Sequence, residues 1–319
     1  MPVPSIDPFN NNEQPRLATV TVSGERRVAV AIDGVVVDLA AALPDAPTTV
    51  VALIAAWDAW SERIAALDAS APTCRFDAFA PPVDAGKVIC VGANYYDHVA
   101  EMAGPAGLAI TDDPFPFGFL KPGTALAGHD EPVYLPSWAH KVDWEAELAL
   151  VIGPPVADDA DPLDAVFGYT ITNDLSARDF LPFPHALGLD ALVSKGFDGA
   201  APIGPWITPA AAVADPADLP VRLTVNGEVM QDSSTAQLIF GLREIVGHYR
   251  RVMTLRPGDV IATGTPAGVG AGRRPPRFLA PGDVVEVTIG DLGTLRTPIA
   301  AAAAGAPTLT IEHKNEVRT

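Results

Sequence analysis

The feature that most constrains the fold is a succession of short apolar runs beyond residue 80, each ended by Gly, Pro or Asp. These runs stand at residues 87–95, 144–153, 166–174, 221–230, 258–266 and 282–299. Short apolar runs between turn-forming residues are typical of strands. The clearest helix is at residues 238–253, where one face carries Leu238, Leu242, Ile245, Val246 and Tyr249. The pattern predicts a large, predominantly β domain.

A smaller unit precedes this domain. Residues 19–39 alternate polar and apolar positions around two glycine-containing turns, which predicts a small β-meander. From Thr48 to Leu67, apolar side chains recur at steps of three and four, which predicts one amphipathic helix. Prolines then punctuate the chain up to residue 82. We therefore expect a small N-terminal α+β domain at residues 1–80 and the β-rich domain at residues 81–319.

The charge of the chain narrows the classes of partner. With 39 acidic and 21 basic residues, the net charge is −18. Nucleic acid and anionic membrane both require a basic surface, so neither is an expected partner. An anionic substrate would also be repelled unless the site carried a metal or a positioned cation. The charge balance therefore favours a metal site for a small molecule.

Cysteine usage and the N-terminus indicate the compartment. Cys74 and Cys90 are the two cysteines, too few for a disulfide framework in a chain of 319 residues. The first residues have no basic segment followed by an apolar one, and no uninterrupted apolar stretch is long enough for a membrane helix. We therefore expect a cytoplasmic protein that is neither exported nor inserted in a membrane.

Three acidic residues are the first candidates for chemistry. Glu145 and Glu147 are two residues apart in an apolar run, so on a strand both side chains point to one face. Asp174 ends another apolar run, where a turn can bring it to the same place. Three carboxylates suit Mg²⁺, Mn²⁺ or Ca²⁺ better than Zn²⁺. The alternatives are an edge strand with a solvated acidic face and a turn-forming or helix-capping Asp174.

A possible general base lies in the first motif of the large domain. His98 and Glu101 are three residues apart and would be neighbours on a short helical turn. A carboxylate beside an imidazole raises its basicity and fixes its tautomer, which suits activation of water. The alternative is an ordinary ion pair on the surface.

Together these segments resemble the fumarylacetoacetate hydrolase superfamily, in its acylpyruvase-like branch. The resemblance rests on four motifs in family order: VGANYYDHVAEM, VDWEAELALVIG, GYTITNDLSARD and LRPGDVIATGTPAGVG. With the segments FGFLKPGTAL, SKGFDGAAPIGPW and VNGEVMQDSST it extends from about Lys87 to Ile299. It implies a mixed β-sandwich roll, commonly dimeric, with a small N-terminal domain in many members.

The resemblance also implies roles for individual residues. Glu145, Glu147 and Asp174 match the metal ligands, usually occupied by Mg²⁺ or Mn²⁺; His98 and Glu101 match the dyad that activates water; Lys195 matches a lysine that stabilises oxyanion or enolate charge. The substrate contacts it implies are Tyr95, Lys121, Arg178, Gln231 and Thr265.

Several of these roles have structural alternatives. Lys195 could be an ordinary solvated lysine, and Lys121 could support the site instead of binding a substrate carboxylate. Arg178 and Asp179 could form a structural ion pair beside the metal ligands, which we favour for that pair. We expect Trp144 to point to the opposite face of its strand, into the core.

Two departures from the family concern the substrate. Some members carry an Arg immediately before the Asn of the first motif, where it holds a substrate carboxylate, but this chain has Ala93 there. Residues 180–193 are apolar where relatives often present a Gln. Both departures favour a substrate whose acyl portion is bulkier or less polar.

We therefore expect a metal-dependent hydrolase that cleaves a C–C bond in a 1,3-dicarbonyl or acylpyruvate-like 2-oxo acid. The metal would polarise a carbonyl, water activated by His98 and Glu101 would attack it, and Lys195 would stabilise the oxyanion. Two alternatives stay open. The same site could serve a keto–enol tautomerase, isomerase or decarboxylase, or the chain could be a catalytically silent metabolite-binding protein. The expected partners are the small-molecule substrate and, by the resemblance, a second copy in a homodimer.

Overall fold

The computed structural model of the chain describes residues 15–103, 115–180 and 190–302. Its strands are β1 (Arg16–Val22), β2 (Glu25–Ile32), β3 (Val35–Asp38), β4 (Ala78–Ala80), β5 (Val88–Val91), β6 (Gly118–Lys121), β7 (Leu126–Ala127), β8 (Val133–Tyr134), β9 (Val142–Asp143), β10 (Ala146–Ile152), β11 (Val166–Asn173), β12 (Ser176–Ala177), β13 (Ala201–Pro209), β14 (Pro220–Val225), β15 (Glu228–Ser234), β16 (Val260–Ala262), β17 (Val284–Ile289) and β18 (Thr294–Ala300). The α-helices are α1 (Leu39–Ala42), α2 (Val50–Ala55), α3 (Trp57–Ala65), α4 (Tyr96–Ala103), α5 (Ala191–Lys195) and α6 (Leu242–Val252).

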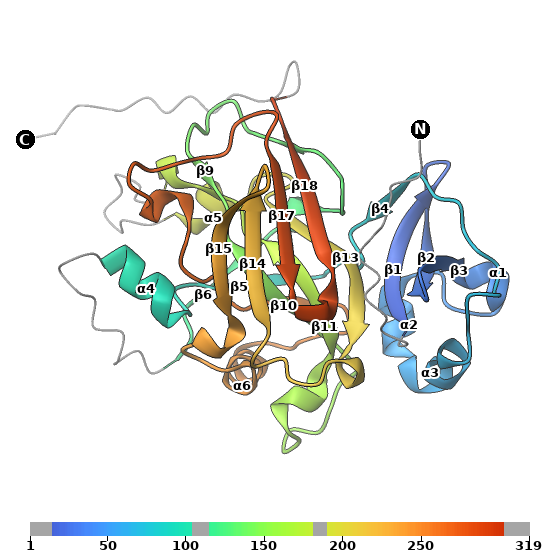
Figure 1. Ribbon diagram of the computed structural model, residues 1–319. Coiled ribbons are helices and arrows are strands. Elements are labelled where there is room, and N and C mark those ends of the chain that lie inside the picture. Colours follow the sequence, from blue (N-terminus) through green and yellow to red (C-terminus); the bar gives the residue numbers. More distant parts are fainter. Residues whose placement is uncertain (1–14, 104–114, 181–189, 303–319) are drawn as a thin grey trace, which may run out of the picture.

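The described strands form two large sheets and one short pair (Figure 1). The eleven-stranded sheet has the order β3-β2-β1-β13-β11-β10-β16-β5-β6, with β4 on β1 and β7 on β13. The five-stranded sheet has the order β15-β14-β17-β18-β8, and β12 pairs with β9. Most neighbours are antiparallel, but β16 with β5, β13 with β7 and β18 with β8 are parallel. The predicted α+β, predominantly β fold of mixed sheets is confirmed.

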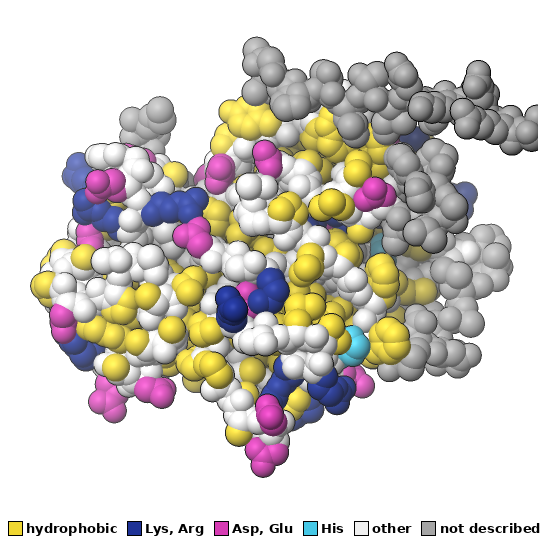
Figure 2. Space-filling model, turned by 180° about the vertical axis from the view of Figure 1, so that it is seen from behind, with side chains coloured by type: hydrophobic (Ala, Val, Ile, Leu, Met, Phe, Trp, Pro, Cys, Tyr) yellow, Lys and Arg dark blue, Asp and Glu magenta, His cyan; other side chains and the backbone are white. Residues whose placement is uncertain are grey.

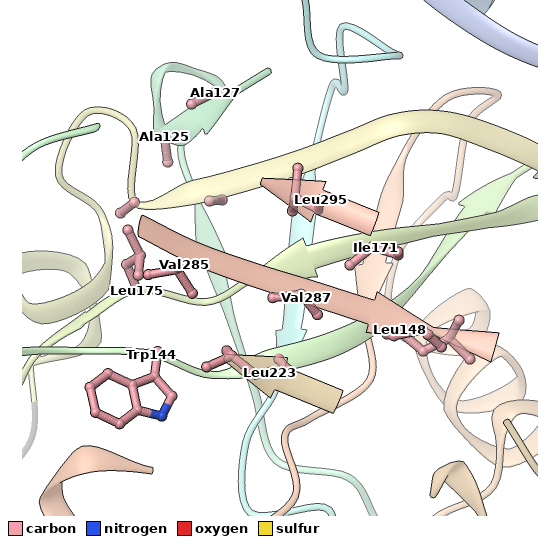
Figure 3. Packing of buried hydrophobic residues seen from close by; sticks show 14 of the residues in the cluster. Ala125, Ala127, Trp144, Leu148, Ile171, Leu175, Leu223, Val285, Val287 and Leu295 are labelled. Carbon is pink, nitrogen blue, oxygen red and sulfur yellow. The ribbon is translucent and has the colours of Figure 1, made fainter. Parts of the chain in front are cut away.

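The main core lies between these two sheets. Leu148 of β10 and Ile171 of β11 pack with Leu223 of β14, Val287 of β17 and Leu295 of β18 (Figure 3). Apolar faces of two stacked sheets are removed from water together, which is the main driving force for such a sandwich. Trp144 is fully buried in the same core, as predicted, and its indole Nε1 donates to the Gly268 carbonyl at 3.1 Å.

The strands that carry the acidic motifs are buried throughout. Every residue of β10 and of β11 is buried. Leu148 and Leu150 face the main core, whereas Ala149 and Val151 pack in a second core together with Leu53 of α2. Because both faces of the sheet are covered here, the sequence from Leu148 to Ile152 is continuously apolar and does not alternate. The predicted buried strand is confirmed.

The N-terminal part follows the prediction except in its helix. The meander is present as β1, β2 and β3, with turns at Gly24 and Gly34. The single helix predicted from Thr48 to Leu67 is wrong, because the helix is interrupted at Ala56, whose φ and ψ are −111° and 21°. Apolar spacing continues across this one residue, so periodicity alone does not reveal the break.

The N-terminal strands also join the long sheet. Leu17 of β1 lies opposite Ile207 of β13, and this part of the chain lies at one side of the molecule (Figure 1). A domain boundary near residue 80 stays a prediction.

Helix α6 begins later than the apolar run that predicted it. Gly241 precedes the first turn, and its backbone N–H donates to the side chain of Glu244 at 2.8 Å. Leu242, Ile245 and Tyr249 are buried in the main core as predicted. Leu238 lies before the helix, at the end of a short 3₁₀ turn. The predicted apolar face is therefore present, but Leu238, the first of its residues, lies outside the helix.

The surface in Figure 2 carries basic side chains in several separate groups, between acidic and hydrophobic ones. Among residues 15–103, 115–180 and 190–302, no helix has the length and apolar character needed to cross a bilayer. The expected absence of nucleic acid and membrane partners stays a prediction.

Candidate metal centre and active site

Three carboxylates converge where β10 and β11 meet. Glu145 immediately precedes β10, Glu147 lies within it, and Asp174 immediately follows β11. These strands are antiparallel neighbours, with Ala146 opposite Asn173, so the start of one lies beside the end of the other. One ligand oxygen of each carboxylate lies within 4.8 Å of the others, and all three residues are buried. The predicted convergence is present, and the solvated edge strand is wrong because β10 lies between β11 and β16.

Three cationic side chains surround these carboxylates. Lys195, at the end of α5, places Nζ 2.7 Å from Glu145 Oε2 and 2.6 Å from Asp174 Oδ2. Arg178 Nη2 lies 2.6 Å from Glu145 Oε1. Lys121, at the end of β6, places Nζ 2.5 Å from Asp174 Oδ1. The solvated-lysine alternative for Lys195 is therefore wrong, because this side chain is buried and doubly ion-paired.

Glu147 differs from its two neighbours in having no cationic partner within 4 Å in the described parts of the chain. Its Oε2 accepts a hydrogen bond from the Gly264 backbone N–H at 2.8 Å. Burial raises the pKa of Glu147, and the charges of Asp174 and Glu145 raise it further. Burial also opposes ionisation of Glu145, but Lys195 and the nearby guanidinium hold its pKa below the ordinary value. A bound divalent cation would compensate the carboxylate that the side chains leave unpaired.

The predicted dyad lies on α4. His98 Nδ1 is 3.4 Å from Glu101 Oε2, and the two side chains are 12% and 18% exposed. Glu101 Oε1 accepts a hydrogen bond from the Gly268 backbone N–H at 3.0 Å. The surface-pair alternative does not describe this arrangement, because Glu101 is fixed by the glycine-rich loop and His98 lines a cavity.

Two glycines of the loop at residues 264–272 approach the site backbone closely. Gly264 has φ +98°, and a Cβ there would lie 2.9 Å from the Cβ of Asn94. Gly268 has φ +105°, and a Cβ there would overlap the Met230 carbonyl oxygen. Only glycine adopts this backbone without strain and leaves room for those neighbours. The loop can therefore deliver two backbone N–H groups to Glu147 and Glu101.

A cavity of about 130 Å³ lies beside these groups. Its polar wall is formed by His98, Glu145, Glu147, Asp174, Arg178, Lys195 and Thr265. Its apolar wall is formed by Val91, Gly92, Ala93, Phe117, Phe119 and Ala191. The structure thus brings the predicted ligands, the predicted base and the predicted lysine to one cavity, whose lining also includes apolar residues.

Three predicted substrate contacts do not reach this cavity in the described structure. Tyr95 is fully buried outside the lining. The buried Lys121 donates to the Ala200 carbonyl at 2.6 Å in addition to its ion pair. Gln231 accepts from the Ala146 N–H at 2.9 Å, and its amide donates to Thr265 Oγ1 at 2.8 Å. Because the polar groups of Lys121 and Gln231 are used within the protein, their positions favour support of the site over substrate contact.

The partners of Arg178 differ from those predicted. Its Nε lies 2.9 Å from Asp143 Oδ2, and its other contact is Glu145. Asp179 instead accepts the backbone N–H groups of His140 and Lys141 at 2.8 and 2.7 Å. The predicted Arg178–Asp179 ion pair is therefore wrong, because the two side chains contact different partners.

Two buried polar residues were missed by the sequence analysis. Asp143 is fully buried and accepts from Gly270 N–H at 2.6 Å. Asn94 is fully buried, accepting from Phe240 N–H at 2.8 Å and donating to the Thr263 carbonyl at 2.8 Å. Asp143 stands two residues before Glu145, so strand alternation could have indicated it; nothing local to Asn94 indicated its distant partners.

Comparison with known proteins decides the family. Residues 87–300 match the family model described as fumarylacetoacetate (FAA) hydrolase C-terminal. The chain belongs to the fumarylacetoacetate hydrolase family. The resemblance predicted from the motifs is thereby confirmed.

Individual members of this family differ in their named activities. The chain is 44% identical to Protein Rv2993c of Mycobacterium tuberculosis over 222 residues, which are 68% of this chain and 77% of that protein. It is 39% identical to the mitochondrial oxaloacetate tautomerase fahd2 of Xenopus laevis, over 69% of this chain and 67% of that protein. Among solved structures, maleylpyruvate hydrolase from Sphingobium sp. SYK-6, in complex with manganese(II) and pyruvate, is 30% identical with a TM-score of 0.70. That match covers 90% of this chain and 100% of the hydrolase.

Proposed function

We propose that this protein is a metal-dependent hydrolase that cleaves a C–C bond in a 1,3-dicarbonyl or acylpyruvate-like 2-oxo acid. The main support is the placement of His98 in the same cavity as the three buried carboxylates. A base next to a carbonyl-binding cation is the arrangement that hydrolysis of such a compound requires.

The site residues fit a hard divalent cation. Glu145, Glu147 and Asp174 would hold Mg²⁺ or Mn²⁺, and Ca²⁺ also accepts such oxygen donors. The unpaired Glu147 carboxylate is the feature of this chain that supports a cation there. When bound, the metal would supply Lewis-acid polarisation of a substrate carbonyl.

His98 would act as the base. Its Nδ1 faces Glu101, which leaves Nε2 to accept a proton from water. The hydroxyl attacks the distal carbonyl carbon, the C–C bond to the central carbon breaks, and the electron pair leaves with the 2-oxo acid fragment as an enolate. That enolate takes the proton that His98 removed from water, which gives the 2-oxo acid, and the acyl fragment becomes a carboxylic acid. Lys195, next to the cavity, would stabilise the negative charge on the attacked oxygen.

A keto–enol tautomerase is the second candidate. The relative from Xenopus laevis is named an oxaloacetate tautomerase. Tautomerisation needs only proton transfer at the carbon between two carbonyls, which His98 could perform without attack by water. The same residues therefore serve either reaction, and the product distinguishes them.

The test is a product assay with Mn²⁺ on acylpyruvates, fumarylpyruvate-like diketo acids and oxaloacetate. From the acylpyruvates and diketo acids we expect the wild type to give a 2-oxo acid and a second carboxylic acid, and we expect their loss in Glu147→Ala and His98→Ala. His140→Ala is the control, because His140 is exposed. Formation of tautomerised product alone would support the second candidate. Absence of any reaction with the whole panel would refute both.

The homodimer and the cytoplasmic location stay predictions. Sedimentation of the purified chain tests the first, and localisation of a tagged chain in its own cell tests the second.

A further inference from the structure

A buried carboxylate that the proposed reaction does not use lies beneath the site. Asp143, the last residue of β9, is fully buried. Its Oδ1 accepts from the N–H groups of Gly270 at 2.6 Å and Trp144 at 2.9 Å, and its Oδ2 accepts from Ala271 N–H at 2.9 Å and Arg178 Nε at 2.9 Å. Four donors on one carboxylate make it a fixed junction between the glycine-rich loop and a cationic side chain.

The first branch of this junction leads to a predicted metal ligand. Arg178 donates through Nε to Asp143 and through Nη2 to Glu145 Oε1 at 2.6 Å. A guanidinium is planar and rigid, so fixing Nε on Asp143 sets the direction in which Nη2 points. The position of the Glu145 carboxylate therefore depends on Asp143 through Arg178.

The second branch leads to the predicted base. Asp143 holds Gly270 and Ala271, and two residues earlier in the same loop Gly268 N–H donates to Glu101 Oε1 at 3.0 Å. The loop also approaches Glu101 at Gly272, where a Cβ would lie 2.5 Å from Glu101 Cδ. A shift of the loop would therefore move the carboxylate that orients His98.

Charge supports the same role. Four buried acidic groups meet at the site, Asp143, Glu145, Glu147 and Asp174, and three cations contact them, Lys121, Arg178 and Lys195. Arg178 forms ion pairs with both Asp143 and Glu145. Without the Asp143 carboxylate, Arg178 would pair with Glu145 alone.

We propose that Asp143 is a positioning residue that links the metal ligands to the base, by fixing Arg178 on Glu145 and the glycine-rich loop on Glu101. This inference rests on the proposed function of the carboxylates as metal ligands. It assigns no contact with substrate to Asp143.

The first test is Asp143→Asn, with Mn²⁺ binding followed by calorimetry. The amide keeps the size of the side chain but presents N–H groups where two donors now bind. We expect Mn²⁺ affinity to fall about 10- to 100-fold, as for other residues that orient ligands. Asp259→Asn is the matched control: Asp259 is also buried, accepts two backbone N–H groups and pairs with Lys87, but lies outside the cavity lining. Equal affinity losses in both variants would overturn the proposal.

The second test is a double-mutant cycle with Arg178→Lys. A lysine cannot bind both carboxylates through a planar fork, so this variant alone should weaken Mn²⁺ binding. If Asp143 acts through Arg178, the double variant should bind no more weakly than Arg178→Lys. Additive losses would contradict this branch, and Arg178→Lys tests the branch even where Asp143→Asn fails to fold.

Hydrogen exchange separates this inference from the proposed function. If the wild type binds no Mn²⁺, the metal proposal fails, and the loop branch is still tested by amide exchange. We expect a peptide covering residues 264–272 to exchange faster in Asp143→Asn than in Asp259→Asn. Unchanged exchange there would overturn the loop branch.

Discussion

Nζ of Lys195 lies 2.6 Å from Oδ2 of Asp174, and both residues are buried. The burial of Lys195 disfavours its charge, but Asp174 and then Glu145 outweigh this, and its pKa is raised. The ammonium group is therefore held charged between two predicted metal ligands. A buried charge left without its partner destabilises a fold by about 3–5 kcal/mol.

Lys195→Met should lower stability mainly in the absence of metal. The substitution keeps an unbranched side chain but leaves the two carboxylates facing each other, so the thermal midpoint in EDTA should fall by several degrees. Mn²⁺ should recover more of that loss than it adds to the wild type, because it would supply the missing positive charge. Lys141→Met, at an exposed lysine, is the control. A variant as stable as the wild type in EDTA would show that Lys195 does not neutralise these carboxylates.

Gly268→Ala should reduce catalysis far more than Gly282→Ala. Both glycines have positive φ, +105° and +97°, so both substitutions carry backbone strain of about 1–2 kcal/mol. At Gly282 a Cβ meets nothing within 4 Å, whereas at Gly268 it overlaps the Met230 carbonyl. The displaced loop would release Glu101. Turnover and thermal midpoints of both variants check this, and equal turnover in the two would contradict it.

His129 should make stability depend on pH in mildly acidic solution. Its Nδ1 accepts from the Arg296 N–H at 3.1 Å, and burial lowers its pKa although Asp130 opposes the shift. A lowered pKa favours the neutral ring in the folded state. The contribution of His129 to folding stability is therefore fully present above the ordinary histidine pKa, near 6.5, and is lost as the pH falls below it. His129→Asn, which keeps an acceptor, should flatten this decline. Urea midpoints between pH 7.5 and 5.0 measure it.

The control for this experiment is His140→Asn, because His140 is exposed. If its profile flattens as much as that of His129→Asn, the pH dependence does not arise from the buried imidazole.

Longer acyl groups should be better substrates. Phe117 and Phe119 are among the apolar residues that line the cavity, and Ala93 supplies no cation of its own. Each methylene removed from water contributes about 0.8 kcal/mol, so kcat/KM should rise about fourfold per added carbon over a short series of acylpyruvates. Phe117→Ala should weaken this trend, and Leu120→Ala, at a similarly exposed residue outside the lining, should not. A flat wild-type series would contradict the predicted preference while leaving hydrolysis intact.

Local pattern was enough to determine the strands and the candidate chemistry. The apolar runs predicted β10 and β11, because a strand buried on both faces is mostly apolar. Spacing alone placed Glu145 and Glu147 on one face and put His98 next to Glu101, because these pairs are separated by two and three residues. Such relations depend on the backbone within one element.

Tertiary structure decided which groups meet across the chain. Asp143 accepts a hydrogen bond from the N–H of Gly270, which is 127 residues away in the sequence. The Gln231 side chain accepts one from the N–H of Ala146, which is 85 residues away. No local pattern encodes these pairs, so Asp143 was missed and Gln231 was assigned to the substrate. Arg178 was likewise paired with its sequence neighbour Asp179, although β9 brings Asp143 closer to its guanidinium. Sequence determines the residue types that a buried polar site needs, and packing of distant strands determines which donor satisfies which acceptor.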